Sequence, residues 1–175
     1  MAVNFRKNRT SILGMIVPQI VHHFFSTTIS GALEAAKKRG YSVLLAQSYD
    51  HLKEEVLASQ YLLGMGVDGL IISVSNETKE AEHLQAFLDE GKAVVQFDKI
   101  TELLPSPKLV VDDFEGAYQA TAHLIREGYR KIAHLSGRME VKNAEQRFLG
   151  YKKALEDHGL VFQEEWVKPC FDITE

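Results

Sequence analysis

Short apolar runs rich in Val, Ile and Leu alternate with longer segments of helical period along the 175-residue chain. The runs "ILGMIV", "SVLLAQ", "GLIISVS" and "AVVQFD" have the length and composition of buried strands, and the segments between them repeat apolar residues at helical spacing. A mainly parallel sheet covered by helices on both faces gives this alternation. The pattern therefore predicts an α/β protein built from βα units.

The same period assigns an inward face to each predicted helix of the first part of the chain. The helix after the first strand ends at Gly40, the second runs from about Lys53 to Met65, and the third ends at Gly91, since Gly commonly terminates helices. The residues expected to face inward are, in chain order, Phe25, Ile29, Leu33 and Ala36, then Val56, Gln60 and Leu63, then Leu84, Phe87 and Leu88.

A proline-containing segment, "ELLPSPK", is expected to be a surface loop and a domain boundary, because Pro lacks a donor and restricts its neighbour. Beyond it the pattern predicts a helix from about Phe114 to Glu127, the strand "KIAHLS", a helix, and a short strand in "EWVKPCF". The inward face of that second helix is expected to carry Ala144, Phe148, Tyr151 and Leu155. The chain stops without a closing helix, so we expect this second α/β set to be incomplete.

Polar residues follow the predicted strands of the first sheet. His22, Ser48, Ser75 and Asp98 each lie just beyond the carboxyl end of one strand. In open α/β sheets the loops at these ends meet the ligand. The sequence therefore predicts a binding cleft at this edge.

Composition and charge limit the partners and the compartment. A formal net charge of −4 argues against direct binding of nucleic acid by this chain, apart from the basic N-terminal residues Arg6, Lys7 and Arg9. One cysteine, Cys170, cannot form an internal disulfide, and neither a membrane span nor a signal peptide is recognisable. These features predict a cytoplasmic protein without a membrane partner.

Motifs for catalysis and for cofactors are not found in the sequence. It lacks G-x-G-x-x-G, the G-x-x-x-x-G-K-[ST] phosphate loop and the G-x-S-x-G elbow, so neither an enzyme nor a cofactor is predicted. His22 and His23 are adjacent and lack further ligands at metal-site spacing, so no metal is predicted. Asp112 and Asp113 are expected to cap the helix after them or to face solvent, because a phosphorylated pair would follow the first strand.

Four ordered motifs resemble one known family. "RTSILGMIVPQIVHHFFSTTISGALEAAKKRGY" is similar to the pattern R-T-x-x-I-G-x-x-x-P-x-I-x-N-P-F-F followed by a helix and G-Y. "GVDGLIIS", "VVDDFEGAYQATAHLIREGYRKIAHLSG" and "RFLGYKKALEDHG" match in the expected order and cover most of the chain. The chain thus resembles the effector-binding, periplasmic-binding-protein-like region of LacI/GalR transcriptional regulators.

The resemblance implies two α/β subdomains of parallel sheets flanked by helices. Residues 1–10 would be a remnant of the hinge or linker, 11–110 a nearly complete N-terminal subdomain, and 111–175 the first part of a truncated C-terminal subdomain. Family members carry an N-terminal helix-turn-helix that contacts operator DNA, which this sequence lacks, and act as homodimers. The helix from Lys53 to Met65 is by analogy a candidate dimer face, although its polar residues fit solvent equally well.

The resemblance also implies a site for a sugar-like effector. Its residues would be His22, Phe24, Phe25, Ser75, Asp98 and Arg147. Aromatic rings suit the apolar faces of sugars, whereas a carboxylate and a guanidinium bind polar groups through charge-assisted hydrogen bonds. Here "HH" replaces the family's Asn-Pro at the start of the first helix, so His23 is expected to begin the helix and His22 to line the cleft.

Each site residue has a structural alternative. The period favours Phe25 in the core, and Ser75 could bond backbone groups at its strand end. Asp98 could pair at the surface, and Arg147 could brace its own helix. The leading hypothesis for function is the ligand-sensing region of a LacI-type regulator under allosteric control. A periplasmic-type sugar-binding protein of an uptake system is the second, and a small α/β enzyme the third.

Overall fold

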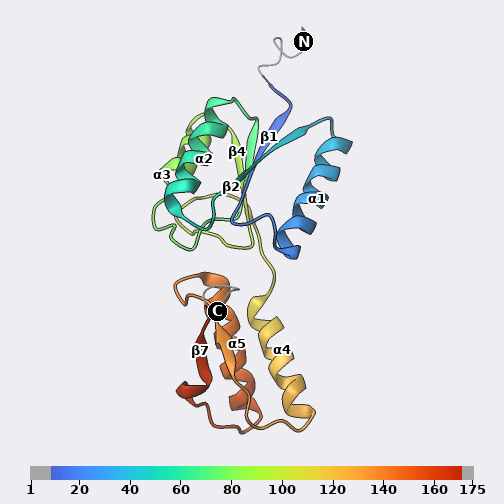
Figure 1. Ribbon diagram of the computed structural model, residues 1–175, viewed down its shortest axis with the longest axis vertical. Coiled ribbons are helices and arrows are strands. Elements are labelled where there is room, and N and C mark those ends of the chain that lie inside the picture. The colour runs from blue at the N-terminus through green and yellow to red at the C-terminus, as the bar shows by residue number, and fades with distance from the viewer. Residues whose placement is uncertain (1–8, 171–175) are drawn as a thin grey trace. The chain divides into compact units, whose positions relative to one another are not determined.

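The computed structural model describes residues 9–170 and divides the chain into two compact units, Met1–Leu109 (unit 1) and Val110–Glu175 (unit 2), shown in Figure 1. Each unit is described separately. Residues 1–8, with Arg6, Lys7 and most of the predicted linker, lie outside the described residues.

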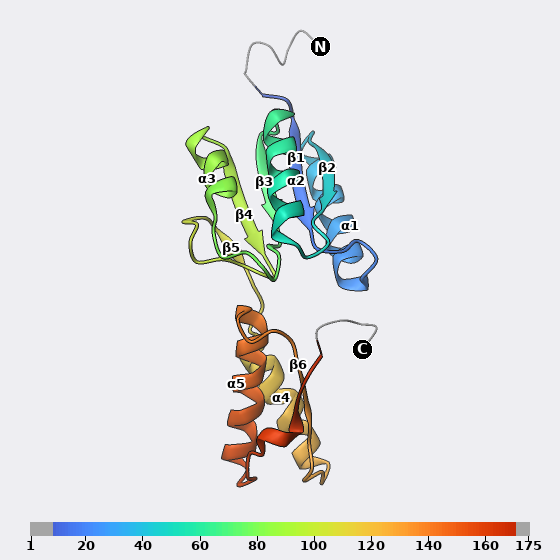
Figure 2. The same ribbon diagram turned by 60° about the vertical axis from the view of Figure 1, so that its left-hand side comes forward.

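Unit 1 is a five-stranded parallel sheet with the strand order β2-β1-β3-β4-β5. Its strands are β1 (Ile12–Val17), β2 (Ser42–Gln47), β3 (Gly69–Ile72), β4 (Ala93–Phe97) and β5 (Lys108–Leu109). Its helices are α1 (His23–Lys38), α2 (Leu52–Gly64) and α3 (Glu82–Asp89). Helix α1 covers one face of the sheet, and α2 and α3 cover the other (Figure 2). The predicted α/β class is confirmed.

The alternation of side chains along β1 builds two cores. Ile16 points to the face where Leu62 of α2 and Phe87 of α3 are buried. Met15 points to the opposite face and packs with Phe25 of α1. Burying one such side chain stabilises the fold by about 1.5–3 kcal/mol, so both faces of the sheet must be covered.

Two of the predicted helix faces need correction. In α2 the buried residues are Glu55, Ser59 and Leu62, whereas Gln60 is exposed, so the predicted face is wrong by one position. Apolar residues occur on all sides of α2, so the hydrophobic period of its sequence does not define a single buried face. In α1 the predicted inward residue Leu33 is exposed, although Phe25, Ile29 and Ala36 are buried as predicted.

Unit 2 pairs two helices with a small parallel sheet. Its elements are α4 (Asp113–Arg126), β6 (His134–Ser136), α5 (Lys142–Asp157), the 3-10 turn η1 (Glu164–Trp166) and β7 (Val167–Pro169). The strand in "KIAHLS" is shorter than predicted. A Cβ on Gly150 would lie 2.1 Å from the Phe114 carbonyl oxygen, so glycine allows α4 and α5 to approach closely.

Within residues 9–170, no helix is both long enough and apolar enough to span a membrane.

Candidate functional site

The loop after β1 carries the first predicted site residues. His22 is the N-cap of α1 without a side-chain capping bond, and the helix begins at His23 as predicted. Phe24 is 52% exposed, whereas Phe25 is 8% exposed and packs edge-on against Phe97 at 6.3 Å between ring centroids. Phe24 is therefore accessible to a ligand, and Phe25 is a core residue of unit 1.

The loop after β3 is held from beneath by a buried carboxylate. Glu55 of α2 is 0% exposed, and its oxygens accept hydrogen bonds from the Ser75 backbone N–H and the Thr78 hydroxyl. His83 Nε2 lies 2.8 Å from Glu55 Oε1, and since a carboxylate only accepts, this nitrogen is the donor. The Ser75 hydroxyl bonds within its loop, to Thr78 Oγ1 at 2.9 Å.

A second polar cluster joins three strand ends of unit 1. Asp50 accepts a hydrogen bond from Lys99 Nζ at 2.6 Å and another from the Asn76 backbone N–H at 2.9 Å. Lys99 also donates to Asn76 Oδ1 at 2.9 Å. Asp50 and its neighbour Tyr49 have positive φ values of 64° and 53°, a strained region that these charge-assisted bonds stabilise.

The loop after β4 presents Asp98, which also has a positive φ, 56°. The Ser73 hydroxyl donates to Asp98 Oδ2 at 3.3 Å. His22, Ser75 and Asp98 follow β1, β3 and β4, which are neighbours in the sheet, so the fold brings these three positions to one edge of unit 1. Ser48, which follows β2, is fully buried.

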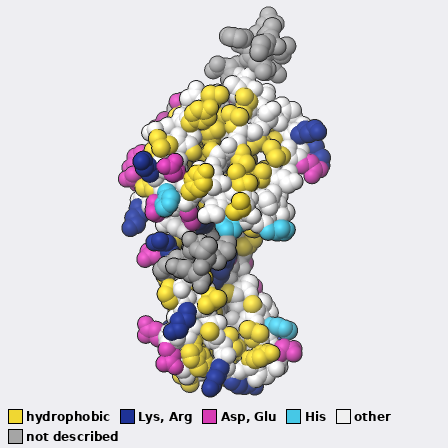
Figure 3. All heavy atoms as spheres, in the orientation of Figure 1, with side chains coloured by type: hydrophobic (Ala, Val, Ile, Leu, Met, Phe, Trp, Pro, Cys, Tyr) yellow, Lys and Arg dark blue, Asp and Glu magenta, His cyan; other side chains and the backbone are white. Residues whose placement is uncertain are grey.

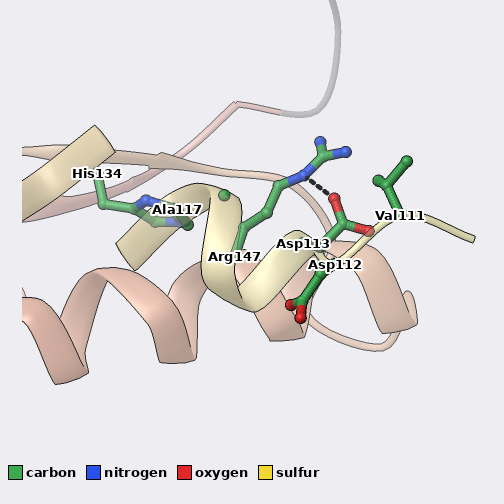
Figure 4. A pocket seen from close by; sticks show the side chains of 7 residues that line it. Val111, Asp112, Asp113, Ala117, His134 and Arg147 are labelled. Atoms are coloured by element: carbon green, nitrogen blue, oxygen red, sulfur yellow. Dashed lines mark hydrogen bonds and ion pairs between the residues drawn. The ribbon is translucent and has the colours of Figure 1, made fainter. Parts of the chain in front are cut away.

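Unit 2 contains a pocket of its own, about 460 Å³ in volume, at the start of α4 (Figure 4). Arg147 of α5 donates from Nε to Asp113 Oδ1 at 2.7 Å. This bond braces α5 against α4, whereas the structural alternative weighed for Arg147 was bracing within its own helix. Asp112 accepts from the Glu115 backbone N–H at 2.9 Å and so caps α4, which is one of the two alternatives that the sequence left open for the pair Asp112 and Asp113. Because only Nε is used in this bond, the two terminal nitrogens of Arg147 point away from Asp113.

His134 forms another wall of this pocket, and the sequence reasoning did not select it. Its ring stacks on Tyr151 at 5.1 Å between centroids and is tilted against Phe148 at 6.0 Å. Burial, together with the positive charge of Arg147, lowers the pKa of His134 below its usual 6.5. The imidazole is therefore neutral at neutral pH.

The described residues offer hydrogen bonds and aromatic faces for a ligand. Within residues 9–170, no group of three His, Cys, Asp or Glu side chains is placed to hold a metal ion. A parallel α/β sheet with polar strand ends and a carboxylate–guanidinium pocket defines a class, the small-molecule-binding α/β modules.

Comparison with known proteins identifies the family. The family described as "Periplasmic binding proteins and sugar binding domain of LacI family" matches residues 10–174, and the chain belongs to it. Among curated relatives, the HTH-type transcriptional repressor PurR of Vibrio vulnificus is 29% identical over 167 residues, which is 95% of this chain and 49% of that protein.

Solved structures agree with this assignment. A putative ribose operon repressor from Burkholderia thailandensis has a TM-score of 0.86 and 27% identity, over 92% of this chain and 61% of that one. A complex of the transcriptional regulator CelR with cellobiose has a TM-score of 0.77 and 25% identity, over 93% of this chain and 51% of that one.

The named relatives are repressors and regulators rather than enzymes, in agreement with the prediction that this chain is a binding region. They do not favour the uptake-protein alternative. The chain spans about half the length of the curated relative it matches.

Proposed function

We propose that this chain is the ligand-sensing region of a LacI-type transcriptional regulator, which binds a sugar or related small effector and thereby controls DNA binding allosterically. The observation that carries the proposal is the pocket of unit 2, where Arg147 keeps two terminal nitrogens directed away from Asp113. A guanidinium and a carboxylate together suit the hydroxyl groups of a sugar.

Unit 1 would supply the remaining ligand contacts. The exposed ring of Phe24 suits an apolar sugar face, and His22, Ser75 and Asp98 follow three neighbouring strands. A contact by the buried Phe25 would require its side chain to move. That the effector lies between the two units stays a prediction. The similarity to a ribose operon repressor and to a cellobiose complex supports a sugar as the effector.

Operator DNA would be bound by a helix-turn-helix outside this sequence, in the cytoplasm. Effector binding would act by shifting the population between DNA-binding and non-binding states, since a ligand changes such an equilibrium by its difference in affinity for the two states.

A homodimer is part of the proposal. The exposed apolar residues Leu57 and Tyr61 of α2 and Met65 at its C-cap recur at every fourth position and so lie on one side of the helix. Figure 3 shows apolar side chains gathered on one face of unit 1. Exposed apolar surface of this kind commonly marks a protein interface. In the full-length protein, Tyr61→Glu should shift light scattering from dimer to monomer mass, whereas Gln60→Glu should not.

The test of effector binding is calorimetric titration of the full-length protein with a panel of neutral sugars, sugar phosphates and nucleobases. Arg147→Ala should weaken the best ligand by about 10- to 100-fold, because a hydrogen bond from a charged group contributes about 1.5–3 kcal/mol. Lys153→Ala is the matched control, since Lys153 is also a cation of α5 in an ion pair.

The same ligand should change the fluorescence anisotropy of a labelled operator bound by the full-length protein, and the Arg147→Ala variant should require proportionally more ligand. If no member of the panel binds, or if the ligand binds without affecting DNA affinity, the proposed function is wrong.

A further inference from the structure

We infer that His134 is a specificity-determining residue of the unit 2 pocket. The pocket would prefer an uncharged ligand group that can both donate and accept hydrogen bonds, such as a hydroxyl, to an anionic group. This inference rests on the proposed function and adds the chemical class of ligand group that the pocket prefers.

The first step concerns the orientation of the imidazole. One face of the His134 ring stacks on Tyr151, and Tyr151 is itself fixed because its hydroxyl donates to the Ile132 carbonyl oxygen at 2.8 Å. Phe148 restricts a second side. With its body held by two aromatic rings, His134 still lines the pocket, where it lies beside Ala117 (Figure 4).

The second step concerns the hydrogen-bonding capacity of the pocket wall. The side chains that line the pocket are those of Val111, Asp112, Asp113, Ala117, His134 and Arg147. Carboxylates only accept hydrogen bonds and a guanidinium only donates, whereas a neutral imidazole offers one donor and one acceptor. Depending on its tautomer, the ring nitrogen of His134 that meets a ligand can either accept a hydrogen bond from a hydroxyl group or donate one to it, which no other side chain of this lining can do.

The third step concerns charge. Two carboxylates and one guanidinium line the pocket, so their formal sum is negative while His134 is neutral. The nearby charged or titratable groups are Asp112 and Asp113 on α4, Arg147 and Tyr151 on α5, and Lys168 on β7. A phosphate or carboxylate group would meet the two carboxylates, whereas a hydroxyl group brings no charge.

Lowering the pH gives the inference a signature. Protonation of His134 removes its acceptor nitrogen, so the affinity for a neutral ligand should fall as the pH is lowered through the pKa of His134, which burial holds below 6.5. An anionic ligand would show the opposite trend, because it would stabilise the protonated imidazole.

The experiment compares matched probes on the full-length protein. Calorimetry at pH 7.5 and pH 5.5 would use ribose against ribose 5-phosphate and glucose against glucose 6-phosphate. His134→Phe keeps the aromatic stack on Tyr151 but removes both polar atoms, and His134→Gln keeps a donor and an acceptor without a titratable group. His123→Gln, an exposed histidine of α4, is the control for histidine replacement in the same unit.

The neutral sugar should bind more tightly than its phosphate. His134→Phe should weaken it about five- to tenfold, as expected for one lost hydrogen bond, while thermal unfolding stays cooperative. His134→Gln should bind at both pH values alike, and His123→Gln should match the wild type.

Tighter binding of the phosphate, or unchanged binding in His134→Phe while Arg147→Ala weakens the same ligand, overturns the assignment of His134 and leaves the proposed function standing. Absence of binding by any probe overturns both.

Discussion

Removing the buried carboxylate of Glu55 should lower the free energy of unfolding of unit 1 by several kcal/mol. Glu55→Ala takes the acceptor away from the Ser75 N–H and from His83 Nε2, and both donors are buried. Each buried donor that loses its acceptor costs about 1–3 kcal/mol of stability. Thr78 adds little to this loss, because its hydroxyl keeps the hydrogen bond with Ser75 Oγ. Because two buried donors lose their acceptor, the expected loss of unfolding free energy is about 2–6 kcal/mol.

Urea unfolding of the full-length protein, followed by far-ultraviolet circular dichroism, measures this loss. Glu54→Ala is the matched control, because Glu54 is an acidic residue of the same first turn of α2. Its effect should stay below about 1 kcal/mol. Amide hydrogen exchange in the loop at residues 73–81 should accelerate in Glu55→Ala only, since this loop loses its attachment to α2.

Glu55→Gln tests the charge separately from the shape. The carboxamide would place its NH₂ group against a donor, so this variant should also lose stability, though less than Glu55→Ala. An unfolding midpoint of Glu55→Ala equal to that of Glu54→Ala would refute the reasoning. So would a Glu55→Gln variant as stable as the wild type, because the donors would then not need a carboxylate.

Three further outcomes are expected in unit 2. Gly150→Ala should lower the free energy of unfolding by about 3 kcal/mol or more, because its Cβ would meet the Phe114 carbonyl, and should broaden the unfolding transition that Trp166 fluorescence reports. Gly116→Ala is the control and should show neither effect, because the space around Gly116 is open. Tyr151→Phe should cost about 1 kcal/mol in the same assay through loss of the bond to Ile132, and an undiminished midpoint would contradict this. The wild type should lose stability as the pH falls below 6.5, because the unfolded chain binds a proton on His134 more readily than the folded one; His134→Phe should show a smaller acid loss in urea titrations.

The binding elements of unit 1 could be predicted because strand ends are encoded locally. A run such as "AVVQFD" ends where its apolar residues end, and parallel topology then brings His22, Ser75 and Asp98 to one edge. The resemblance to the family motif placed the start of α1 at His23, and the sequence offered capping by the pair Asp112 and Asp113 as one of two alternatives. These features depend on neighbours within a few residues.

The buried polar clusters were not predicted, because their partners lie far apart in the sequence. Glu55 contacts residues 20 to 28 positions away, and Lys99 contacts Asp50 across 49 positions. A charged residue in the first turn of a helix is ordinarily exposed, so only the contacts with Ser75 and His83 explain why Glu55 is buried. His134 was passed over as one of several scattered histidines for the same reason.

The sequence by itself determined the α/β class, the order of the elements and the family, since apolar periodicity and ordered motifs are properties of the chain. Only the tertiary structure decided that Glu55 is buried, that Arg147 bonds to Asp113, and that His134 lines the same pocket as Arg147. The physical reason is that periodicity specifies which side chains leave water, whereas the partner of a polar side chain depends on how separate elements pack.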